Sequence, residues 1–211
     1  MTAAVEAVDV RRSYDLGGAK VEALRGVSLR IDAGEYVAVV GPSGSGKSTL
    51  MHLLGCLDRP TSGELRVGGR DVATLDDSEL ADLRNRTIGF VFQSFALLGR
   101  TTALDNVGLP LVYRGVRRAE RRERAAAALT AVGLGHRLDH RPGQLSGGEQ
   151  QRVLLADEPT GNLDTRSGGE VMAILESLVH DRGVAVVLVT HDLEVAALAN
   201  RRIRVRDGLL E

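Results

Sequence analysis

Short apolar runs rich in β-branched residues alternate along the chain with stretches whose apolar residues are three and four positions apart. The short runs predict strands, and they cover residues 27–31, 36–40, 88–92, 184–190 and 203–205. The other stretches predict helices, over residues 47–57, 119–132 and 167–178. Alternation of this kind is typical of an α/β fold in which helices cover a largely parallel sheet.

The middle of the chain departs from this alternation. Residues 93–144 contain no convincing strand, so we expect a helical subdomain over about residues 93–149. Its RRAERRER run at 117–124 is a candidate binding surface, but acidic residues interrupt the run and apolar residues continue the helix at 125–129. A solvated helix face is therefore the favoured interpretation of this run.

A glycine-rich segment, GPSGSGKST at 41–49, lies between the apolar run 36–40 and the helical run that follows. It fits the phosphate-binding pattern G-x-x-x-x-G-K-[ST], in which backbone N–H groups and a helix N-terminus converge on an anion. Lys47 is expected to reach the β- and γ-phosphates and Ser48 to hold Mg²⁺. A chance match without phosphate is the alternative. The candidate nucleotide-binding residues are Gly41, Pro42, Ser43, Gly44, Ser45, Gly46, Lys47, Ser48 and Thr49.

Composition narrows the remaining possibilities. The length of 211 residues suits a single domain over 1–211, and the net charge of −1 gives no basic footprint for nucleic acid. Cys56 is the only cysteine, which indicates a reducing compartment and a packed side chain. No run approaches the roughly 18 apolar residues that span a bilayer. We therefore expect a soluble chain that reaches a membrane only through another subunit.

A second motif, LSGGEQQR at 145–152, is by itself compatible with an ordinary helix start, with Ser146 and Glu149 forming a capping box. Two other motifs follow this one along the chain and strengthen its functional interpretation. An acidic pair, Asp157 and Glu158, follows the apolar run 153–156, and His191 follows the apolar run 184–189. In this order, and together with the phosphate loop, these motifs resemble the ATP-binding cassette (ABC) ATPases over essentially the whole chain.

The resemblance implies a P-loop NTPase fold, with a mostly parallel sheet core, a small antiparallel β portion and a helical subdomain. It also implies an ATP hydrolase that uses ATP and Mg²⁺. Asp157 would assist Mg²⁺ at the end of a strand, and Glu158 would polarise the attacking water. Gln93 in FVFQ resembles the glutamine that senses Mg²⁺ and the γ-phosphate, and His191 resembles the switch histidine. The alternatives are a solvated strand end for the acidic pair and a structural role for the histidine.

Further roles follow from the same resemblance. Tyr14 stands where the family places an aromatic ring against adenine, although a tyrosine near a strand end is also commonly a packing residue. Two cassettes of the family pair head to tail, so that one chain's LSGG motif caps the γ-phosphate held by the other chain. The signature residues here are Ser146, Gly147 and Gly148, and the loop that crosses the dimer interface corresponds to Asn162, Leu163 and Asp164.

Within the family, residues 41–64 and 88–111 look most like the ATPases of macrolide exporters and lipoprotein-releasing systems. These work with an integral membrane permease, whose coupling helix would enter a groove around residues 95–111. Gly99 stands where such proteins usually have proline, which suggests a more mobile loop. The implied location is peripheral, on the cytoplasmic face of the plasma (inner) membrane.

The resemblance fails between the LSGG motif and the acidic pair. Family members carry a longer helix, a loop and a strand there, whereas nine residue steps separate Gly148 from Asp157 here. About a dozen residues are absent by that comparison, and the remainder cannot supply both helix and strand. We expect the helix that starts at the motif to be little more than one turn.

Two functions follow. The first is an ATPase subunit that powers export or lipoprotein transfer through a separate permease. The second is a nucleotide-binding regulatory or vestigial cassette whose hydrolysis the shortened segment impairs. A soluble cassette acting on ribosomes or DNA is disfavoured, because such proteins usually have two cassettes or a long coiled-coil insert, and neither is present.

Overall fold

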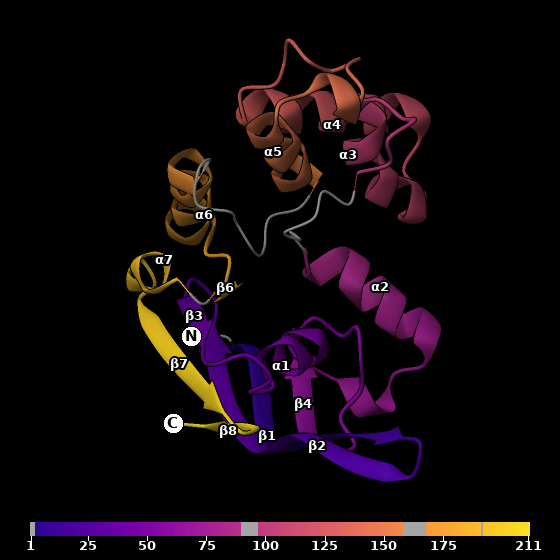
Figure 1. The fold of residues 1–211 in the computed structure, drawn as a ribbon. Coiled ribbons are helices and arrows are strands. Elements are labelled where there is room, and N and C mark those ends of the chain that lie inside the picture. Colours follow the sequence, from indigo (N-terminus) through magenta and orange to yellow (C-terminus); the bar gives the residue numbers. More distant parts are fainter. Residues whose placement is uncertain (1–2, 90–96, 158–167, 191) are drawn as a thin grey trace. The chain divides into compact units, whose positions relative to one another are not determined.

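The computed structural model describes residues 3–89, 97–157, 168–190 and 192–211. The chain divides into two compact units, Met1–Thr87 with Val179–Glu211 and Ile88–Leu178. Figure 1 shows the elements of both units. The first unit holds the sheets, and the second is helical.

The first unit contains an antiparallel sheet of strand order β2-β1-β4-β5. Its strands are β1 (Ala3–Leu16), β2 (Ala19–Asp32), β4 (Ser62–Val67) and β5 (Arg70–Asp71). The long β1–β2 hairpin pairs Val10 with Val27 and Tyr14 with Val21. Side chains alternate between faces along a strand, and the inward set, which includes Val10 and Val27, is buried.

A second sheet of the first unit has the order β6-β3-β7-β8. Its strands are β3 (Tyr36–Val40), β6 (Val186–Val189), β7 (Arg201–Arg206) and β8 (Leu209–Leu210). β3 is parallel to both β6 and β7, and its first four residues are buried. A continuous apolar run is what a central parallel strand requires, so the fold places β3, and the loop that follows it, in the middle of the parallel strands.

Four helices belong wholly to the first unit: α1 (Lys47–Leu54), the 3₁₀ turn η1 (Val72–Thr74), α2 (Asp77–Thr87) and α7 (Leu193–Ala197). Helix α1 stops earlier than the predicted residue 57, because the chain turns at Gly55 and Cys56, and Cys56 adopts a positive φ of 54°. Cys56 is a free, buried thiol, and burial raises its pKa to about 11. The predicted packing role of this cysteine is confirmed.

The second unit packs α3 (Ala103–Tyr113), α4 (Arg118–Ala131), the 3₁₀ turn η2 (Pro142–Gln144) and α5 (Gly147–Asp157). Helix α6 (Gly168–Arg182) crosses the boundary between the units. Apolar residues of α3, α4 and α5 form one cluster, as expected for amphipathic helices. Its buried members are Ala103, Leu104, Val107, Ala125, Leu129, Leu134, Leu145 and Val153.

Two predictions about this region are wrong. The apolar residues 153–156, expected as a strand, continue helix α5, and the helix that starts at the LSGG motif has 11 residues instead of little more than one turn. Val153 is fully buried in the helical cluster, so the packing of this residue favours the helix over the predicted strand. In the predicted strand 88–92, residues 88 and 89 are not in a strand, and the others lie outside the described residues.

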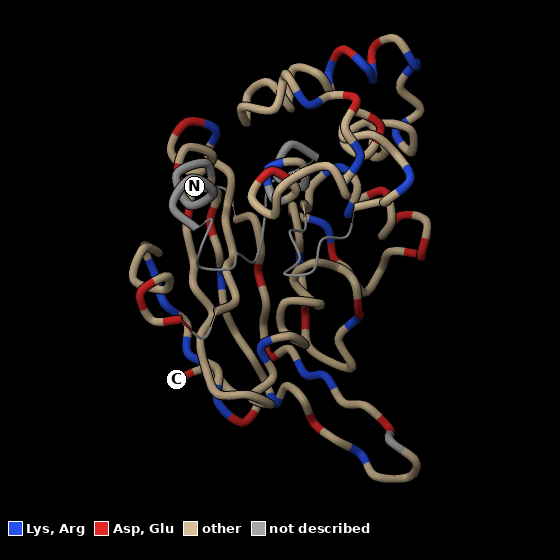
Figure 2. Tube along the Cα trace, turned by 45° about the horizontal axis from the view of Figure 1, so that its top comes forward, with Lys and Arg blue, Asp and Glu red and all other residues tan. Residues whose placement is uncertain are grey.

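The other predicted helices and strands coincide with observed elements to within a few residues, except that the predicted strand 27–31 covers only the last part of β2, which begins at Ala19. The α/β class is confirmed, although the antiparallel sheet is as large as the sheet that contains the parallel strands. Lys and Arg positions are interspersed with Asp and Glu positions along the trace (Figure 2), in keeping with the near-neutral net charge. Within the described ranges, no helix has the length and apolarity to cross a bilayer.

Candidate nucleotide-binding site

The phosphate loop connects β3 to α1, and two of its glycines are required by the backbone around it. Gly46 has a φ of 104°, and a Cβ there would lie 2.5 Å from the carbonyl oxygen of Ala23 on β2. A Cβ at Gly41 would overlap the carbonyl oxygen of Val205 on β7. The loop is therefore held between two strands at a separation that only glycine allows.

The helix after the loop begins without a side-chain cap, because its N-cap residue is Gly46. The first N–H groups of a helix have no partner within the helix, and together with the helix dipole they favour an anion. No acidic residue occupies the first turn of α1 to compete for this position. Pro42, Ser43 and Gly44 of the loop are exposed, so the anion site is accessible.

Lys47 is the first residue of α1, and its side chain folds back over the loop. Its Nζ donates a hydrogen bond of 2.6 Å to the carbonyl oxygen of Pro42 and lies 3.5 Å from Oγ of Ser45. Ser45 itself is buried, with 3% of its surface exposed. The ammonium has three donors, so it can retain a loop contact while another donor turns to a phosphate oxygen. Ser48 follows directly and is exposed.

The C-terminal hairpin of β7 and β8 holds the loop in place through a backbone hydrogen bond. The N–H of Gly208 donates to the carbonyl oxygen of Ser45 at 3.0 Å, and the N–H of Arg25 on β2 donates to the carbonyl oxygen of Gly208 at 2.9 Å. Three segments distant in sequence thus fix one loop. Such bracing sets the loop geometry in advance, which lowers the cost of ordering it around a ligand.

Tyr14, the candidate adenine-stacking residue, belongs to the same unit as the loop. It pairs across the hairpin with Val21, two residues from Ala23, whose carbonyl oxygen borders Gly46. The fold therefore places the ring on the hairpin next to the loop. Its hydroxyl donates to Asp58 at 2.9 Å.

The signature residues lie in the second unit, at the start of α5. The predicted capping box is present: the N–H of Ser146 donates to Oε2 of Glu149 at 2.8 Å, and the N–H of Glu149 donates to Oγ of Ser146 at 3.3 Å. These hydrogen bonds with Ser146, and then the nearby Arg137, lower the pKa of Glu149 to about 2. The capping box orders the backbone that presents Gly147 and Gly148.

The remaining predicted residues are only partly described. Asp157 is the last residue of α5, in the second unit, so the strand end expected for it is not formed. Gln93, Glu158, His191 and the interface loop 162–164 lie outside the described residues. Asp192, next to the predicted switch histidine, caps α7 by accepting from the N–H groups of Glu194 and Val195. Among the described side chains, no cluster of three His, Cys, Asp or Glu could hold a metal.

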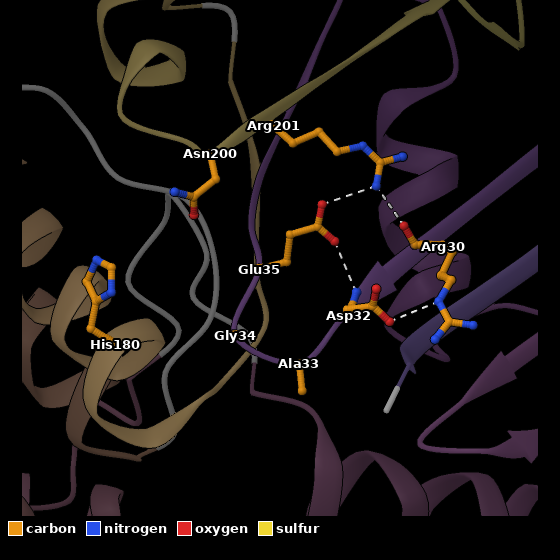
Figure 3. A pocket seen from close by; sticks show the side chains of 8 residues that line it. All are labelled: Arg30, Asp32, Ala33, Gly34, Glu35, His180, Asn200 and Arg201. Carbon is orange, nitrogen blue, oxygen red and sulfur yellow. Dashed lines mark hydrogen bonds and ion pairs between the residues drawn. The ribbon is translucent and has the colours of Figure 1, made fainter. Parts of the chain in front are cut away.

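One further cavity, of about 420 Å³, lies at the opposite end of β3 from the phosphate loop (Figure 3). Its charged side chains are paired with one another: Arg201 donates to Glu35 at 3.1 Å and Arg30 to Asp32 at 2.9 Å. The amide oxygen of Asn200 accepts from the N–H of Tyr36 at 3.2 Å. Arg201 on β7 also donates to the carbonyl oxygen of Arg30 on β2 at 2.8 Å. The polar lining is thus accounted for by contacts within the fold, without a ligand.

Comparison with known proteins decides the family. The model of the family described as "ABC transporter" matches residues 24–160, a range that contains the phosphate loop, the LSGG motif and the acidic pair. This chain belongs to the ABC transporter family. It is therefore a nucleotide-binding, ATP-hydrolysing cassette of an ABC transporter, and the fold and activity predicted from the sequence are confirmed.

Curated relatives agree with this assignment. An uncharacterized ABC transporter ATP-binding protein of Thermotoga maritima is 54% identical over 223 positions, covering all of this chain and 95% of the relative. The macrolide export ATP-binding/permease protein MacB of Shigella sonnei is 54% identical over 99% of this chain. The chain spans about a third of the length of the MacB relatives that it matches.

Solved structures resemble the cassette as a whole. The ATP-binding cassette MJ0796, in a dimeric post-hydrolysis state bound to ADP and Pi, is 41% identical with a TM-score of 0.87. The match covers 98% of this chain and 96% of that one. A second dimeric structure of MJ0796 matches at 40% identity with the same TM-score.

The Thermotoga comparison also bears on the shortened segment. That alignment has 223 positions and includes the whole chain of 211 residues, so 12 positions face a gap in this cassette. The number supports the estimate of about a dozen absent residues. None of the comparisons supports the hydrolysis-impaired alternative.

The sequence patterns did not single out Arg12 and Asp58, which contact the candidate adenine-stacking residue Tyr14. Asp58 is 44 residues away from Tyr14 along the chain, and no local sequence pattern predicts a contact over that separation. The contact of Arg12 with Tyr14 could have been predicted, because the two residues are two positions apart and therefore lie on the same face of a strand.

Proposed function

We propose that this cassette powers export or lipoprotein transfer through a separate integral membrane permease. The name of the MacB relatives, macrolide export ATP-binding/permease protein, supports export. The single observation that carries the energy-coupling role is the phosphate loop, braced by β2 and β7 so tightly that Gly41 and Gly46 tolerate no Cβ. A loop without side chains at these two positions exposes its backbone N–H groups, which can bind an anion.

ATP would bind with its β- and γ-phosphates on the loop. The backbone N–H groups of Gly44 to Thr49 would bind phosphate oxygens, and Lys47 would turn one donor from Pro42 toward them. Ser48 would hold Mg²⁺, together with Gln93 and Asp157. This ion supplies charge neutralisation between the phosphates when bound. The exposed hydroxyl of Ser48 on the first turn of α1 supports its part in this set.

Hydrolysis would rest on Glu158 and His191, together with Gln93. Glu158 would accept a proton from the attacking water, His191 would act as the switch histidine, and Gln93 would sense Mg²⁺ and the γ-phosphate. The order of these residues relative to the phosphate loop and the LSGG motif supports the proposal.

The complete site is proposed to need a second copy of the chain, in a head-to-tail dimer. Ser146, Gly147 and Gly148 of one copy would cap the γ-phosphate that Lys47 of the other copy binds. The capping box supports this role, because Glu149 engages the N–H of Ser146 and leaves the glycine N–H groups of the next residues free to face an anion. The solved structures of MJ0796 are dimeric.

The permease is proposed to dock on the second unit, around residues 95–111, and to hold the chain at the cytoplasmic face of the plasma (inner) membrane. Apolar side chains exposed next to this segment support the proposal: Leu98 is 50%, Val112 45% and Tyr113 77% exposed. The backbone at Leu98 is fixed to α3 through Asn106, whose amide oxygen accepts from the N–H of Leu98 at 2.8 Å. We further propose that residues 1–211 act as one cassette, with residues 93–149 as its helical subdomain.

Purification with a membrane partner tests this function. The tagged cassette, isolated from detergent-solubilised membranes of its host, should bring down an integral membrane protein, and that complex reconstituted in liposomes should hydrolyse ATP faster than the cassette alone. Leu98→Ser should reduce the recovery of the partner and leave ATP binding unchanged. Recovery of no membrane protein, with full ATPase activity of the free cassette, would refute coupling to a permease.

A further inference from the structure

The ring of Tyr14 is held on two sides. The guanidinium carbon of Arg12 lies 4.5 Å from the ring centroid, over one face. The Tyr14 hydroxyl donates to Oδ2 of Asp58 at 2.9 Å, and Nη2 of Arg12 lies 2.8 Å from Oδ1 of Asp58. The three side chains therefore form a closed triangle, in which each member contacts the other two.

Asp58 connects this triangle to the helix that follows the phosphate loop. The N–H of Asp58 donates to the carbonyl oxygen of His52 on α1 at 3.3 Å, and Oδ1 accepts from the N–H of Arg59 at 2.8 Å. Arg59 in turn donates to the carbonyl oxygen of Leu75 at 2.6 Å and to Asp77. The carboxylate of Asp58 is thus fixed by its own backbone and aims both oxygens at β1.

Surface ion pairs contribute little to stability on average, so stability alone gives weak reason for this arrangement. The Arg12 and Asp58 side chains are only 23% and 24% exposed, and Nε of Arg12 is buried without a hydrogen-bond partner in the described structure. A buried donor without a partner is costly, so the position of the guanidinium over the ring is a feature that needs an explanation beyond the ion pair. Because Arg12 covers one face of the Tyr14 ring, a planar group that stacks on the ring would have to use the opposite face.

We propose that Arg12 and Asp58 are positioning residues for the purine base, an inference that rests on the proposed binding of ATP at the phosphate loop. Asp58 fixes the in-plane direction of the Tyr14 ring through the hydroxyl, and Arg12 fixes its tilt by stacking. The base then stacks on the face of the ring opposite Arg12. Because Asp58 is attached to the end of α1, the base platform and the phosphate loop keep a constant separation.

Binding of ATP and of inorganic tripolyphosphate, each with Mg²⁺, separates this role from a structural one. Tripolyphosphate has the phosphates but no base, so it reports on the loop alone. Isothermal titration of Arg12→Met and Asp58→Ala should show ATP binding weakened roughly three- to tenfold, the range that an aromatic contact of its usual strength corresponds to. Tripolyphosphate binding should stay at the wild-type value.

Conservative variants sharpen the test. Asp58→Asn keeps an oxygen for the Tyr14 hydroxyl and should recover part of the ATP affinity, whereas Tyr14→Phe keeps the ring, loses the hydroxyl and should fall between wild type and Asp58→Ala. Glu64→Gln is the matched control, because it removes an exposed ion pair with Arg66 from the same sheet. This control should change neither affinity.

The other possible results of these titrations would overturn the proposal. Equal loss of ATP and tripolyphosphate affinity would show that Arg12 and Asp58 serve the fold, and wild-type ATP affinity in both variants would likewise overturn the proposal. Should Arg12→Met or Asp58→Ala fail to fold, Tyr14→Phe decides alone. A wild-type protein that binds neither ligand would refute the proposed nucleotide site itself, and the inference would fall with it.

Discussion

The Nζ atom of Lys47 lies 2.6 Å from the carbonyl oxygen of Pro42, five residues earlier in the chain. This contact ties the two ends of the phosphate loop together through a mobile ammonium. It also places the only lysine of the loop where phosphates are expected. Every other positive charge of the chain except Lys20 is an arginine, which forms a planar fork rather than a compact charge.

Replacing Lys47 by alanine should therefore weaken ATP binding roughly 10- to 100-fold, as expected for the loss of a hydrogen bond to a charged group. Titration with a fluorescent ATP analogue measures this. Lys20→Ala, in the β1–β2 hairpin, is the control and should bind like wild type. Unchanged affinity in Lys47→Ala would remove this residue from its assigned role.

A second prediction concerns Gly41, whose Cβ would overlap the carbonyl oxygen of Val205. Gly41→Ala should cost about 2–4 kcal/mol of unfolding free energy, because backbone strain and overpacking add. Gly44→Ala is the matched control: its φ is 77°, but nothing lies within 4 Å of the added carbon, so the cost should be about 1–2 kcal/mol. Denaturant unfolding of the two variants compares them. An equal loss of unfolding free energy in the two variants would show that β7 shifts to make room for the Cβ at position 41.

The third prediction follows from the capping box of α5. Because hydrogen bonds with Ser146 hold the pKa of Glu149 at about 2, below its ordinary value of 4.5, the folded state gains stability from the ionised carboxylate. This gain is fully present above about pH 4.5 and is lost as the pH falls toward 2. Glu149→Gln should therefore be less stable than wild type at pH 6 but equal to it near pH 2. Thermal unfolding across this range would contradict the account if the difference stayed constant.

The fourth prediction tests Glu158 as the catalytic carboxylate. Glu158→Gln should retain ATP but hydrolyse it at least ~100-fold more slowly, since an amide does not accept a proton from water. Phosphate release with a coupled assay measures the rate. Glu176→Gln, an exposed position of α6, is the control and should turn over like wild type. Undiminished turnover in Glu158→Gln would show that another residue accepts the proton from water.

The fifth prediction concerns the shortened segment. Inserting the 12 absent residues from the Thermotoga relative after Val153 should let the helix end within the insert and release residues 154–157 to form a strand. The melting temperature and the ATP hydrolysis rate should both rise, because Asp157 then ends a strand instead of a helix. Circular dichroism should show the added helix. A less stable protein with an unchanged rate would show that the short connection is already the native solution.

The sequence patterns predicted well where one physical cause dominated. Residues 36–40 form a continuous apolar run followed by glycines, and β3 covers the same residues, because only a buried strand accommodates such a run next to a glycine turn. The phosphate loop was equally predictable, since its residues form one continuous pattern, G-x-x-x-x-G-K-[ST], between a strand and a helix. Of the β1–β2 hairpin only residues 27–31 were predicted as a strand, because register shifts between Ala7 and Val10 and beyond interrupt the alternation of the rest.

Longer-range causes account for the errors. An apolar run such as residues 153–156 fits a strand and a buried helix turn equally well, and the choice depends on Leu129 and Leu134, which pack around Val153 from other parts of the chain. In the candidate site, the contact of Tyr14 with Asp58 has the same origin. Neither contact has a signature that can be seen within a window of a few residues.

The bracing of the phosphate loop by Gly208 and Val205 has a consequence for biosynthesis. Ser45 leaves the ribosome about 160 residues before the hairpin that holds it. Until β7 has been translated, no carbonyl of Val205 confines Gly41 and no N–H of Gly208 binds Ser45. We therefore expect the nascent cassette to bind ATP only after β7 has formed, which makes nucleotide binding a late event in the synthesis of the chain.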